Sequence, residues 1–364
     1  MPGRRASVPV LGRRRGGRGG RGDREDRGGG ARTVRVLMWH VHGSWATSFV
    51  HGPQTTLVPV TPDRGPDGKG RPDTFHWPGR AVEVPPERLR GEDVDAVVLQ
   101  RPHELRLAEE WLGRRPGRDV PAVYVEHDTP RRTPSDIGVP EEVVPDSRHF
   151  LHDRSDIPVV HVTHFNRLFW NCGRAPTTVI EHGVVDPGHR YTGDMPRAGV
   201  VVNDPLRRGR VAGTDLLAEL AAAVPLDLFG MNVAGVPGRL GIAPESLWTF
   251  EDLPQARMHE ELARRRVYVH PYRWTSLGLA LIEAMMLGLP VVALATTEAV
   301  EAVPPEAGVL STRVATLADA ARTLAADPPR ARQMGKEARA HAAERYGLTR
   351  FLRDWRRTLQ EVTR

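Results

Sequence analysis

Residues 270–294 combine a helix start that suits a phosphate with a single carboxylate, in the order HPYRWTSLGLALIEAMMLGLPVVAL. The pattern predicts a buried strand over 267–270 and a helix over 277–287, with its first turn near Gly278. Unpaired backbone N–H groups and the helix dipole favour an anion at such a terminus. Gly278 lets the backbone approach a ligand closely because it has no side chain. The segment therefore predicts a phosphate site directly after a strand.

Glu283 is the one carboxylate in this predicted helix, which is apolar on nearly every side. Such a helix must be buried, and a buried carboxylate lowers stability unless it has a partner. One interpretation is a structural partner, such as an arginine or a backbone cap. The other is a ligand with two neighbouring hydroxyls, as on a ribose. Glu283 lies on the second turn, below the predicted phosphate site, so the pair suits a nucleotide.

The same segment resembles the E-x7-E region of family-4 retaining glycosyltransferases, written E-P-F-G-L-x-x-x-E-A-M-A-x-G-x-P-V-V-A. The positions that match in register are Gly278, Leu279, Glu283, Ala284, Met285, Gly288, Pro290, Val291, Val292 and Ala293. The resemblance implies that Glu283 binds the ribose hydroxyls of a nucleotide sugar, with Gly278 and Leu279 in the donor site. The family's first glutamate falls at Thr275, and Ser276 and Leu277 replace its Pro and Phe.

Two further segments resemble donor-binding loops of that family. Glycines that contact the donor are replaced here by the loop Thr296-Thr297-Glu298, where threonine hydroxyls could substitute for backbone contacts. The pattern G-R-L-x-x-x-K-G, aligned on Gly213, places Arg207 at the arginine that contacts the diphosphate and Ala212 at the lysine. We expect Arg210 to supply the missing charge. The alternative for these arginines is a solvated loop.

The absence of the first glutamate generates a hypothesis about the reacting end of the donor. Thr275 can donate and accept a hydrogen bond but carries no charge. We expect Thr275 and Ser276 to face the donor, and Glu298 to lie in the same cleft and compensate for the missing carboxylate. The alternative is that Thr275 only caps the helix.

The N-terminal half offers polar groups at strand ends for an acceptor or for the donor phosphates. His42, Gly43 and Ser44 follow the first predicted strand, where the family has a glycine-containing loop. His127 ends a later strand, and we expect it to orient a donor or acceptor hydroxyl; packing is its alternative role. The segment IEHGV at 180–184 resembles the family's I-P-N-G-V.

Two successive runs of alternating strands and helices would position these residues. The strand-like segments expected are 34–39, 56–60, 94–99, 122–125, 159–162 and 177–180, then 199–202, 226–229, 267–270 and 291–294. Their nearly continuous apolar character is typical of buried parallel sheets. Ligands of such sheets bind at the carboxyl ends of the strands.

The alternation predicts an α/β fold of two Rossmann-like domains facing a cleft, with a helical C-terminal segment, and the resemblance implies GT-B architecture. We expect a disordered Arg/Gly-rich tail over 1–33, an acceptor domain over 34–190 and a donor domain over 191–340. A C-terminal helix over 341–364 would pack back on the first domain.

The composition of the chain limits which kinds of binding partner and site are expected. Residues 1–33 hold ten arginines and three acidic residues, so the rest of the chain sums to about −1 although the whole chain carries +6. A folded part near neutrality does not predict a specific nucleic-acid face. Cys172 is the only cysteine, which excludes an internal disulfide and a cysteine-cluster metal site. Without an apolar run of about eighteen residues or a signal peptide, we expect a cytoplasmic protein, with peripheral membrane contact allowed.

The resemblance implies a metal-independent enzyme that transfers a sugar from a nucleoside diphosphate to a glycan, a lipid-linked sugar or a small molecule. Arg207, Arg210 and the helix start at Gly278 would stabilise the leaving diphosphate. A sugar-nucleotide epimerase is one alternative, for which Glu126 and Asp128 are the candidate carboxylates. A non-catalytic nucleotide-sugar-binding protein is the other.

Removing residues 1–33 is expected to leave turnover on soluble acceptors unchanged, because this low-complexity tail lacks an apolar pattern that could build a site. The measurement compares the turnover of the truncated and full chains. A truncated chain that melts at the same temperature but no longer turns over would contradict this prediction.

Overall fold

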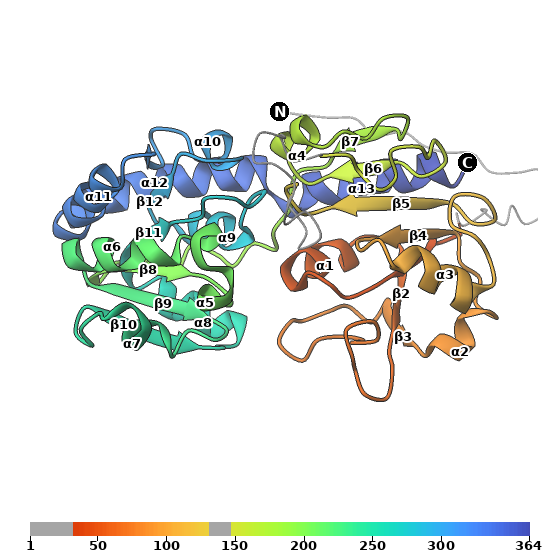
Figure 1. The fold of residues 1–364 in the computed structure, drawn as a ribbon, viewed down its shortest axis with the longest axis horizontal. Coiled ribbons are helices and arrows are strands. Elements are labelled where there is room, and N and C mark those ends of the chain that lie inside the picture. Colours follow the sequence, from red (N-terminus) through yellow and green to blue (C-terminus); the bar gives the residue numbers. More distant parts are fainter. Residues whose placement is uncertain (1–31, 131–146) are drawn as a thin grey trace, which may run out of the picture. The chain divides into compact units, whose positions relative to one another are not determined.

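A computed structural model describes residues 32–130 and 147–364 of the chain. Their strands form two sheets in which every neighbouring pair is parallel (Figure 1). The first sheet has the order β3-β2-β1-β4-β5-β6-β7, and the second has the order β10-β9-β8-β11-β12-β13. The prediction of two successive parallel α/β halves is confirmed. The predicted tail over 1–33 lies almost wholly outside the described residues.

The strands of the first sheet are β1 Arg35–Met38, β2 Thr55–Pro59, β3 Ala81–Val84, β4 Ala96–Leu99, β5 Ala122–Glu126, β6 Val159–His161 and β7 Thr177–Val179. Those of the second sheet are β8 Met195–Val201, β9 Leu226–Gly230, β10 Leu247–Glu251, β11 Arg265–His270, β12 Val291–Leu294 and β13 Gly308–Ser311.

The helices of the first half are α1 Gly43–Val50, α2 Pro86–Leu89, α3 Glu104–Leu112 and α4 His164–Phe169. Those that follow are α5 Pro205–Arg208, α6 Leu217–Ala223, α7 Val236–Leu240, α8 Gln255–Leu262, α9 Leu279–Leu287, α10 Ala299–Ala302, α11 Val314–Ala326, α12 Pro328–Arg345 and α13 Leu348–Val362. The 3-10 turns Gly209–Ala212 and Thr214–Leu216 precede α6. No helix among the described residues is long and apolar enough to span a membrane.

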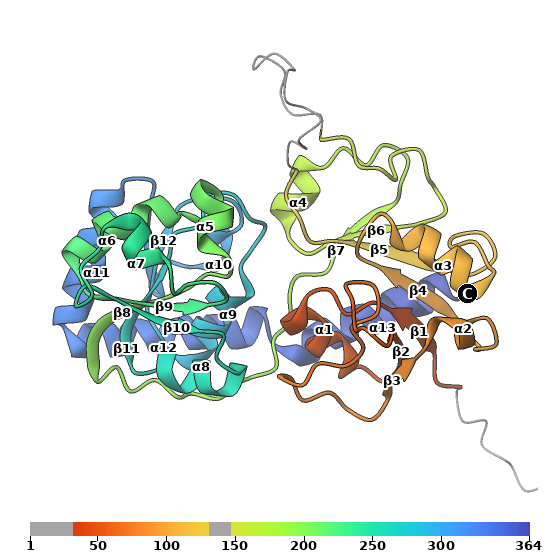
Figure 2. The same cartoon turned by 60° about the horizontal axis from the view of Figure 1, so that its bottom comes forward.

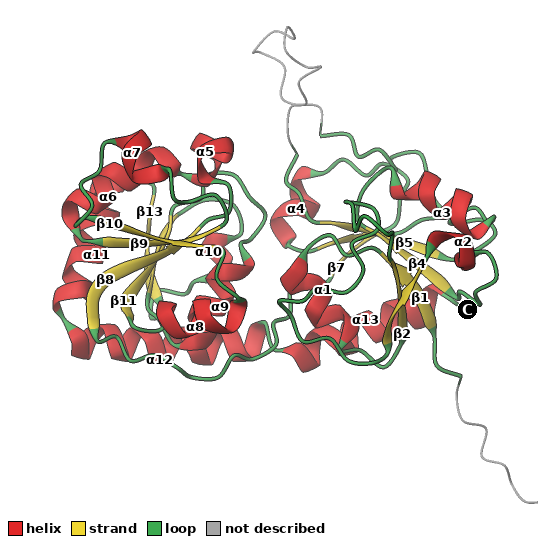
Figure 3. Ribbon diagram, turned by 90° about the horizontal axis from the view of Figure 1, so that it is seen from below, coloured by secondary structure: helices red, strands yellow, loops and turns green. Residues whose placement is uncertain are grey.

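Each sheet is covered by helices on both faces, as Figure 3 shows. The central strands are therefore buried on both sides; β4 and β12, for example, are buried along their whole length. Strands with this environment are continuous apolar runs because neither face meets water. In the first sheet, Leu37 of β1 lies between Leu57 of β2 and Val97 of β4 in register. The carboxyl ends of the strands are thereby brought to one edge of each sheet.

The C-terminal helix α13 is amphipathic and packs on the first sheet's helix layer, beside α1 (Figure 2). Phe351, Trp355 and Leu359 are buried in one cluster with Trp45 and Phe49 of α1. Trp355 lies edge-on to both α1 rings, with centroid distances of 5.7 Å to Trp45 and 5.1 Å to Phe49. The last helix therefore completes the core of the half that begins the chain.

Several elements depart from the sequence prediction. The sequence HVHGSW over 40–45 is typical of a polar loop, whereas helix α1 begins at Gly43 within it. The Pro-, Gly- and Arg-rich segment 61–90 is typical of a long loop but contains β3 and α2. Strand β8 begins inside 183–197, whose polar, Pro- and Gly-containing composition is typical of a linker.

Replacing Trp355 by alanine is expected to lower the free energy of unfolding by about 3–5 kcal/mol, because the indole is 2% exposed and its removal takes a large side chain out of the cluster. Urea unfolding followed by circular dichroism measures the loss. Arg357→Ala on the exposed face of the same helix is the control, since its side chain is 67% exposed. Equal stabilities of the two variants would contradict the packing of α13 on α1.

Candidate functional site

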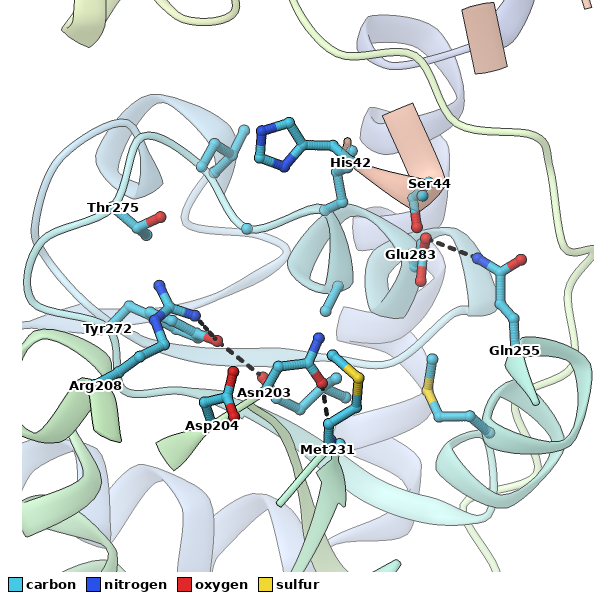
Figure 4. A pocket seen from close by; sticks show the side chains of 18 of the residues that line it. His42, Ser44, Asn203, Asp204, Arg208, Met231, Gln255, Tyr272, Thr275 and Glu283 are labelled. Atoms are coloured by element: carbon cyan, nitrogen blue, oxygen red, sulfur yellow. Dashed lines mark hydrogen bonds between the residues drawn. The ribbon is translucent and has the colours of Figure 1, made fainter. Parts of the chain in front are cut away.

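A cavity of about 720 Å³ lies at the carboxyl ends of the strands and is lined by residues from both halves of the chain. From the first half its walls include His42, Gly43, Ser44, Thr74, Phe75, His127, Asp128 and His182. From the second half they include Asn203, Asp204, Arg207, Arg208, Asp252, Gln255, His270, Tyr272, Thr275, Ser276, Gly278, Leu279 and Glu283. Figure 4 shows Glu283 reaching Gln255 on one side of the cavity and Arg208 beside Tyr272 on the other.

Ten of the thirteen residues predicted for the site line this cavity. They are His42, Gly43, Ser44, His127, Arg207, Thr275, Ser276, Gly278, Leu279 and Glu283. The remaining three, Arg210, Thr297 and Glu298, do not line it.

The structure corrects the choice of arginine. Arg210 is on a 3-10 turn, its side chain is 77% exposed, and it donates to Asp215 at 2.8 Å. Arg208 lines the cavity instead, with its guanidinium carbon 5.0 Å from the ring of Tyr272. The short helix α5 and the turn after it rotate neighbouring arginines to different sides, which spacing in the sequence does not reveal.

Glu298 was predicted to lie in the same cleft as Thr275, but it does not line the cavity. Its side chain is 2% exposed and accepts a hydrogen bond from the backbone N–H of Phe165 at 2.8 Å. Arg345 lies 3.5 Å from its other oxygen. Burial raises the pKa of Glu298 above its usual value, and these two contacts act against the rise. Thr297, at a φ of 50°, turns the chain from β12 into this buried position.

The N-terminus of α9 meets the cavity as the sequence predicted. Gly278 is the N-cap, and no side chain there caps the free N–H groups of the first turn. A Cβ atom at Gly278 would come 2.8 Å from a ring carbon of His270, so the lack of a side chain is required. Ser276 instead donates its hydroxyl to the backbone carbonyl of His127 at 2.7 Å. The helix start thus presents backbone donors to the cavity.

Glu283 has protein partners, although neither is the arginine or the backbone cap that the structural interpretation expected. Gln255 donates to Oε1 at 3.1 Å, and His259 Nε2 lies 3.1 Å from Oε2. Both partners come from one face of α8, where residues four apart lie above one another. The carboxylate still lines the cavity, and an oxygen of a carboxylate accepts more than one hydrogen bond. The pairing therefore holds Glu283 in place and leaves acceptor capacity for a ligand.

Four histidines line the cavity, and three of them have strongly lowered pKa values. Burial, followed by the nearby His42, lowers the pKa of His182 to about 3, and burial followed by Arg208 lowers that of His270 to about 3. Burial also holds the pKa of His127 well below its usual value, helped by His42 and His182. At neutral pH these three rings are uncharged.

Sequence reasoning missed several lining residues. Arg208, Tyr272, Asn203 and His182 belong to the cavity, and Asn203 accepts from the backbone N–H of Met231 at 3.0 Å. Asn203 and Tyr272 each follow a strand of the second sheet closely, so their position after strands β8 and β11 was a usable signal. His182 takes the place of the asparagine in the pattern I-P-N-G-V, a substitution that also marked it.

The epimerase carboxylates and the histidines can also be located in the structure. Of the carboxylates considered for an epimerase, Asp128 lines the cavity, but Glu126 is buried beneath it and bonds to His149 and to the N–H of Asp128. Among the described residues, no group of three or more His, Cys, Asp and Glu side chains is arranged to hold a metal ion. His40, two positions before His42, instead bonds to the carbonyl of Gly70.

Part of the chain matches a known protein family, and most of it superposes on solved structures. Residues 240–341 match the family "Glycosyl transferases group 1". Sucrose-phosphate synthase from Thermosynechococcus elongatus superposes with a TM-score of 0.65 over 90% of this chain and 98% of its own, at 15% identity. Anabaena HepE, solved in complex with UDP and glucose, superposes with a TM-score of 0.67 over 90% of this chain and 100% of its own, at 17% identity. No curated protein sequence matches the chain.

The chain has the GT-B fold. Its two Rossmann-like halves and the helices at its C-terminus correspond to those of the two solved proteins over nearly their whole length. The matched segment 240–341 begins before β10 and contains α8, α9 and the loop at Thr275, which line part of the cavity. The lining residues Asn203, Asp204, Arg207 and Arg208 lie before the matched segment.

Acidification is expected to destabilise the fold through the buried neutral histidines. Their folded pKa lies below the unfolded value of about 6.5, so the unfolded chain binds more protons and stability falls as pH drops below about 6.5. At pH 5 a histidine such as His182 contributes about 2 kcal/mol of this loss. Urea unfolding at pH 7 and pH 5 measures it.

The matched variant is His182→Asn, which removes the titrating group. It should lose about 2 kcal/mol less than the original chain between the two pH values, whatever its stability at pH 7. His152→Asn, on a side chain 24% exposed and outside the cavity, is the control. An identical pH dependence of His182→Asn and the original chain would show that His182 does not remain neutral in the folded protein.

Proposed function

We propose that this protein is a glycosyltransferase that takes a sugar from a nucleoside diphosphate and transfers it to an acceptor hydroxyl. The observation that carries the proposal is the placement of Glu283 below the N-terminus of α9, with both facing one cavity. A carboxylate accepts from the two hydroxyls of a ribose, and the helix start binds the neighbouring diphosphate. The family match over 240–341 covers both elements.

The arginines on the opposite wall complete the diphosphate site in this proposal. Arg207 lines the cavity with a side chain 74% exposed and pairs with Asp204, while Arg208 lies over Tyr272. An arginine that is paired only at the surface can reorient toward a phosphate at small cost. Together with the α9 terminus they would stabilise the leaving diphosphate, so the reaction would proceed without a metal ion.

The transfer itself replaces one bond at the anomeric carbon. The acceptor oxygen bonds to that carbon as the bond to the diphosphate oxygen breaks, and the hydroxyl proton leaves with the diphosphate. Retention of configuration is part of the proposal because it follows from the family resemblance. His127 and Thr275, both in the cavity wall, are the side chains proposed to contact the transferred sugar. The acceptor, whether glycan, lipid-linked sugar or small molecule, enters from the side of His42, Gly43 and Ser44.

UDP-linked sugars are the first donors to test, since Anabaena HepE, which shares the fold, was solved with UDP and glucose. A thermal-shift screen with UDP, GDP, ADP and their glucose conjugates identifies the base. A ligand at a hundred times its dissociation constant stabilises the folded chain by about 2.7 kcal/mol, which raises the melting temperature by several degrees. Turnover is then followed with and without EDTA, and the proposal expects no difference between the two.

Glu283→Gln is expected to weaken binding of the nucleotide found in this screen by about ten- to a hundredfold, because two charge-assisted hydrogen bonds to the ribose lose their charge. Isothermal titration measures the dissociation constant. The unliganded variant should lose about 1–2 kcal/mol of stability, since Gln255 and His259 also lose a charged acceptor.

Glu260→Gln, on the exposed face of α8 with a side chain 53% exposed, is the control and should bind the nucleotide normally. Unchanged affinity in Glu283→Gln would reject the ribose role. Tight binding by the original chain with no transfer to any acceptor pool would favour the non-catalytic nucleotide-sugar-binding protein. Interconversion of donor sugars without an acceptor would favour the epimerase.

A further inference from the structure

Gln100 connects the buried backbone of the first half to the cavity wall. It directly follows β4, is 5% exposed, and donates from Nε2 to the carbonyl of Trp39 at 2.8 Å. Its Oε1 lies 3.1 Å from Nε2 of His127. The hydroxyl of Tyr124 donates to its backbone carbonyl at 3.1 Å, which fixes the main chain at this point.

The donors and acceptors in this chain of hydrogen bonds can be assigned in only one way. A backbone carbonyl accepts hydrogen bonds and never donates, so the amide NH₂ of Gln100 must face Trp39. The amide oxygen then faces His127, and this oxygen is also only an acceptor. The hydrogen bond between them therefore requires a proton on Nε2 of His127.

The other ring nitrogen of His127 is left as an acceptor. The ring is buried and neutral, because burial and the neighbouring His42 and His182 lower its pKa. A neutral imidazole carries one proton, so Nδ1 has a lone pair. No described residue forms a hydrogen bond with Nδ1, and His127 lines the cavity.

Packing keeps the ring in this orientation. The ring of His127 lies 4.1 Å from that of His42 and meets Trp45 edge-on at 5.0 Å. A half-turn of the imidazole would bring a carbon atom against Gln100 and leave the amide oxygen without a partner in a buried position. An unpaired buried polar group costs about 1–3 kcal/mol, which is enough to select one orientation.

We propose that Gln100 is a positioning residue that holds His127 with its proton on Nε2 and its Nδ1 as a hydrogen-bond acceptor in the cavity. His127 then accepts a hydrogen bond from a substrate hydroxyl and does not donate one. The ring discriminates in favour of a hydroxyl or amine at this place and against a carboxylate or carbonyl, because two acceptors face each other there unfavourably. That this hydroxyl belongs to the sugar or its acceptor rests on the proposed function; the state of the ring does not.

The protonation state is measured directly by NMR of the chain labelled with ¹⁵N in its histidine rings. Long-range ¹H–¹⁵N correlations distinguish a protonated ring nitrogen from an unprotonated one, and the spectrum of His127→Phe identifies the His127 signals. At neutral pH the expected result is a protonated Nε2 and an unprotonated Nδ1. A protonated Nδ1, or a ring protonated on both nitrogens, would overturn the proposal without any variant of Gln100.

Two variants then test the role of Gln100. Gln100→Leu removes the acceptor, and the His127 signals should become those of mixed or reversed tautomers. Gln100→Glu places a carboxylate beside Nε2, so the pKa of His127 should rise relative to the original chain. Gln54→Leu is the control: Gln54 is also 5% exposed and donates to a backbone carbonyl, that of Phe49, at 2.8 Å.

The control should leave the His127 signals unchanged. If Gln100→Leu and Gln100→Glu fold and show the His127 spectrum and titration of the original chain, Gln100 does not set the ring and the proposal is wrong. If they do not fold, the spectrum of the original chain still decides the tautomer. A failure of the nucleotide screen would reject the proposed function and leave this spectrum unaffected, so the two failures are distinguishable.

Discussion

The burial of α9 is the constraint on which the site depends. The helix is apolar on all sides, and every residue from Leu281 to Leu287 is buried, in one cluster with strands β11 and β12 and helix α12. A Cβ atom on Gly335 of α12 would come 2.0 Å from the carbonyl oxygen of Gly288, so the two helices touch at the backbone. A helix locked at this end cannot shift along its axis. Its N-terminus, and the backbone donors on it, are therefore held at the cavity.

The same burial means that the charge of Glu283 lowers the stability of the fold unless the carboxylate is paired. A carboxylate surrounded by apolar side chains must be paired, and α8 provides Gln255 and His259 from one face for this purpose. Because the pair is supplied by a helix that also borders the cavity, holding the carboxylate and exposing it to a ligand are compatible. The protein partners of Glu283 therefore do not exclude a ligand, because each carboxylate oxygen accepts more than one hydrogen bond.

In the first half, a polar group in the cavity wall is held by uncharged hydrogen-bond partners. Trp39, Gln100 and His127 form a directed chain of hydrogen bonds from a buried carbonyl to the cavity, with no charge at any step. Burial keeps His127 and His182 uncharged, so the part of the wall that the first half supplies is polar without adding positive charge. Arg207, Arg208 and the N-terminus of α9, which are positive, come from the second half.

The amino-acid sequence by itself determined the two parallel α/β halves, the start of α9 and the place of Glu283 on that helix. These follow from local chemistry: continuous apolar runs require burial on both faces, and a helix start is marked within a few residues. It did not reveal α1 or β3, because both lie in segments whose polar or Pro- and Gly-rich composition is typical of loops. Such elements exist only because distant residues, such as Trp355 for α1, cover them.

Only the tertiary structure decided which side chains of a loop reach the cavity. Arg208 does and Arg210 does not, since a 3-10 turn directs the second toward Asp215. Glu298 directly follows Thr296 and Thr297, but its carboxylate contacts Phe165 and Arg345, which lie more than forty positions away along the chain. The partners of Glu283 and the proton of His127 were likewise invisible in the sequence. The direction of a side chain is fixed by contacts between segments distant along the chain, and a local pattern holds no record of them.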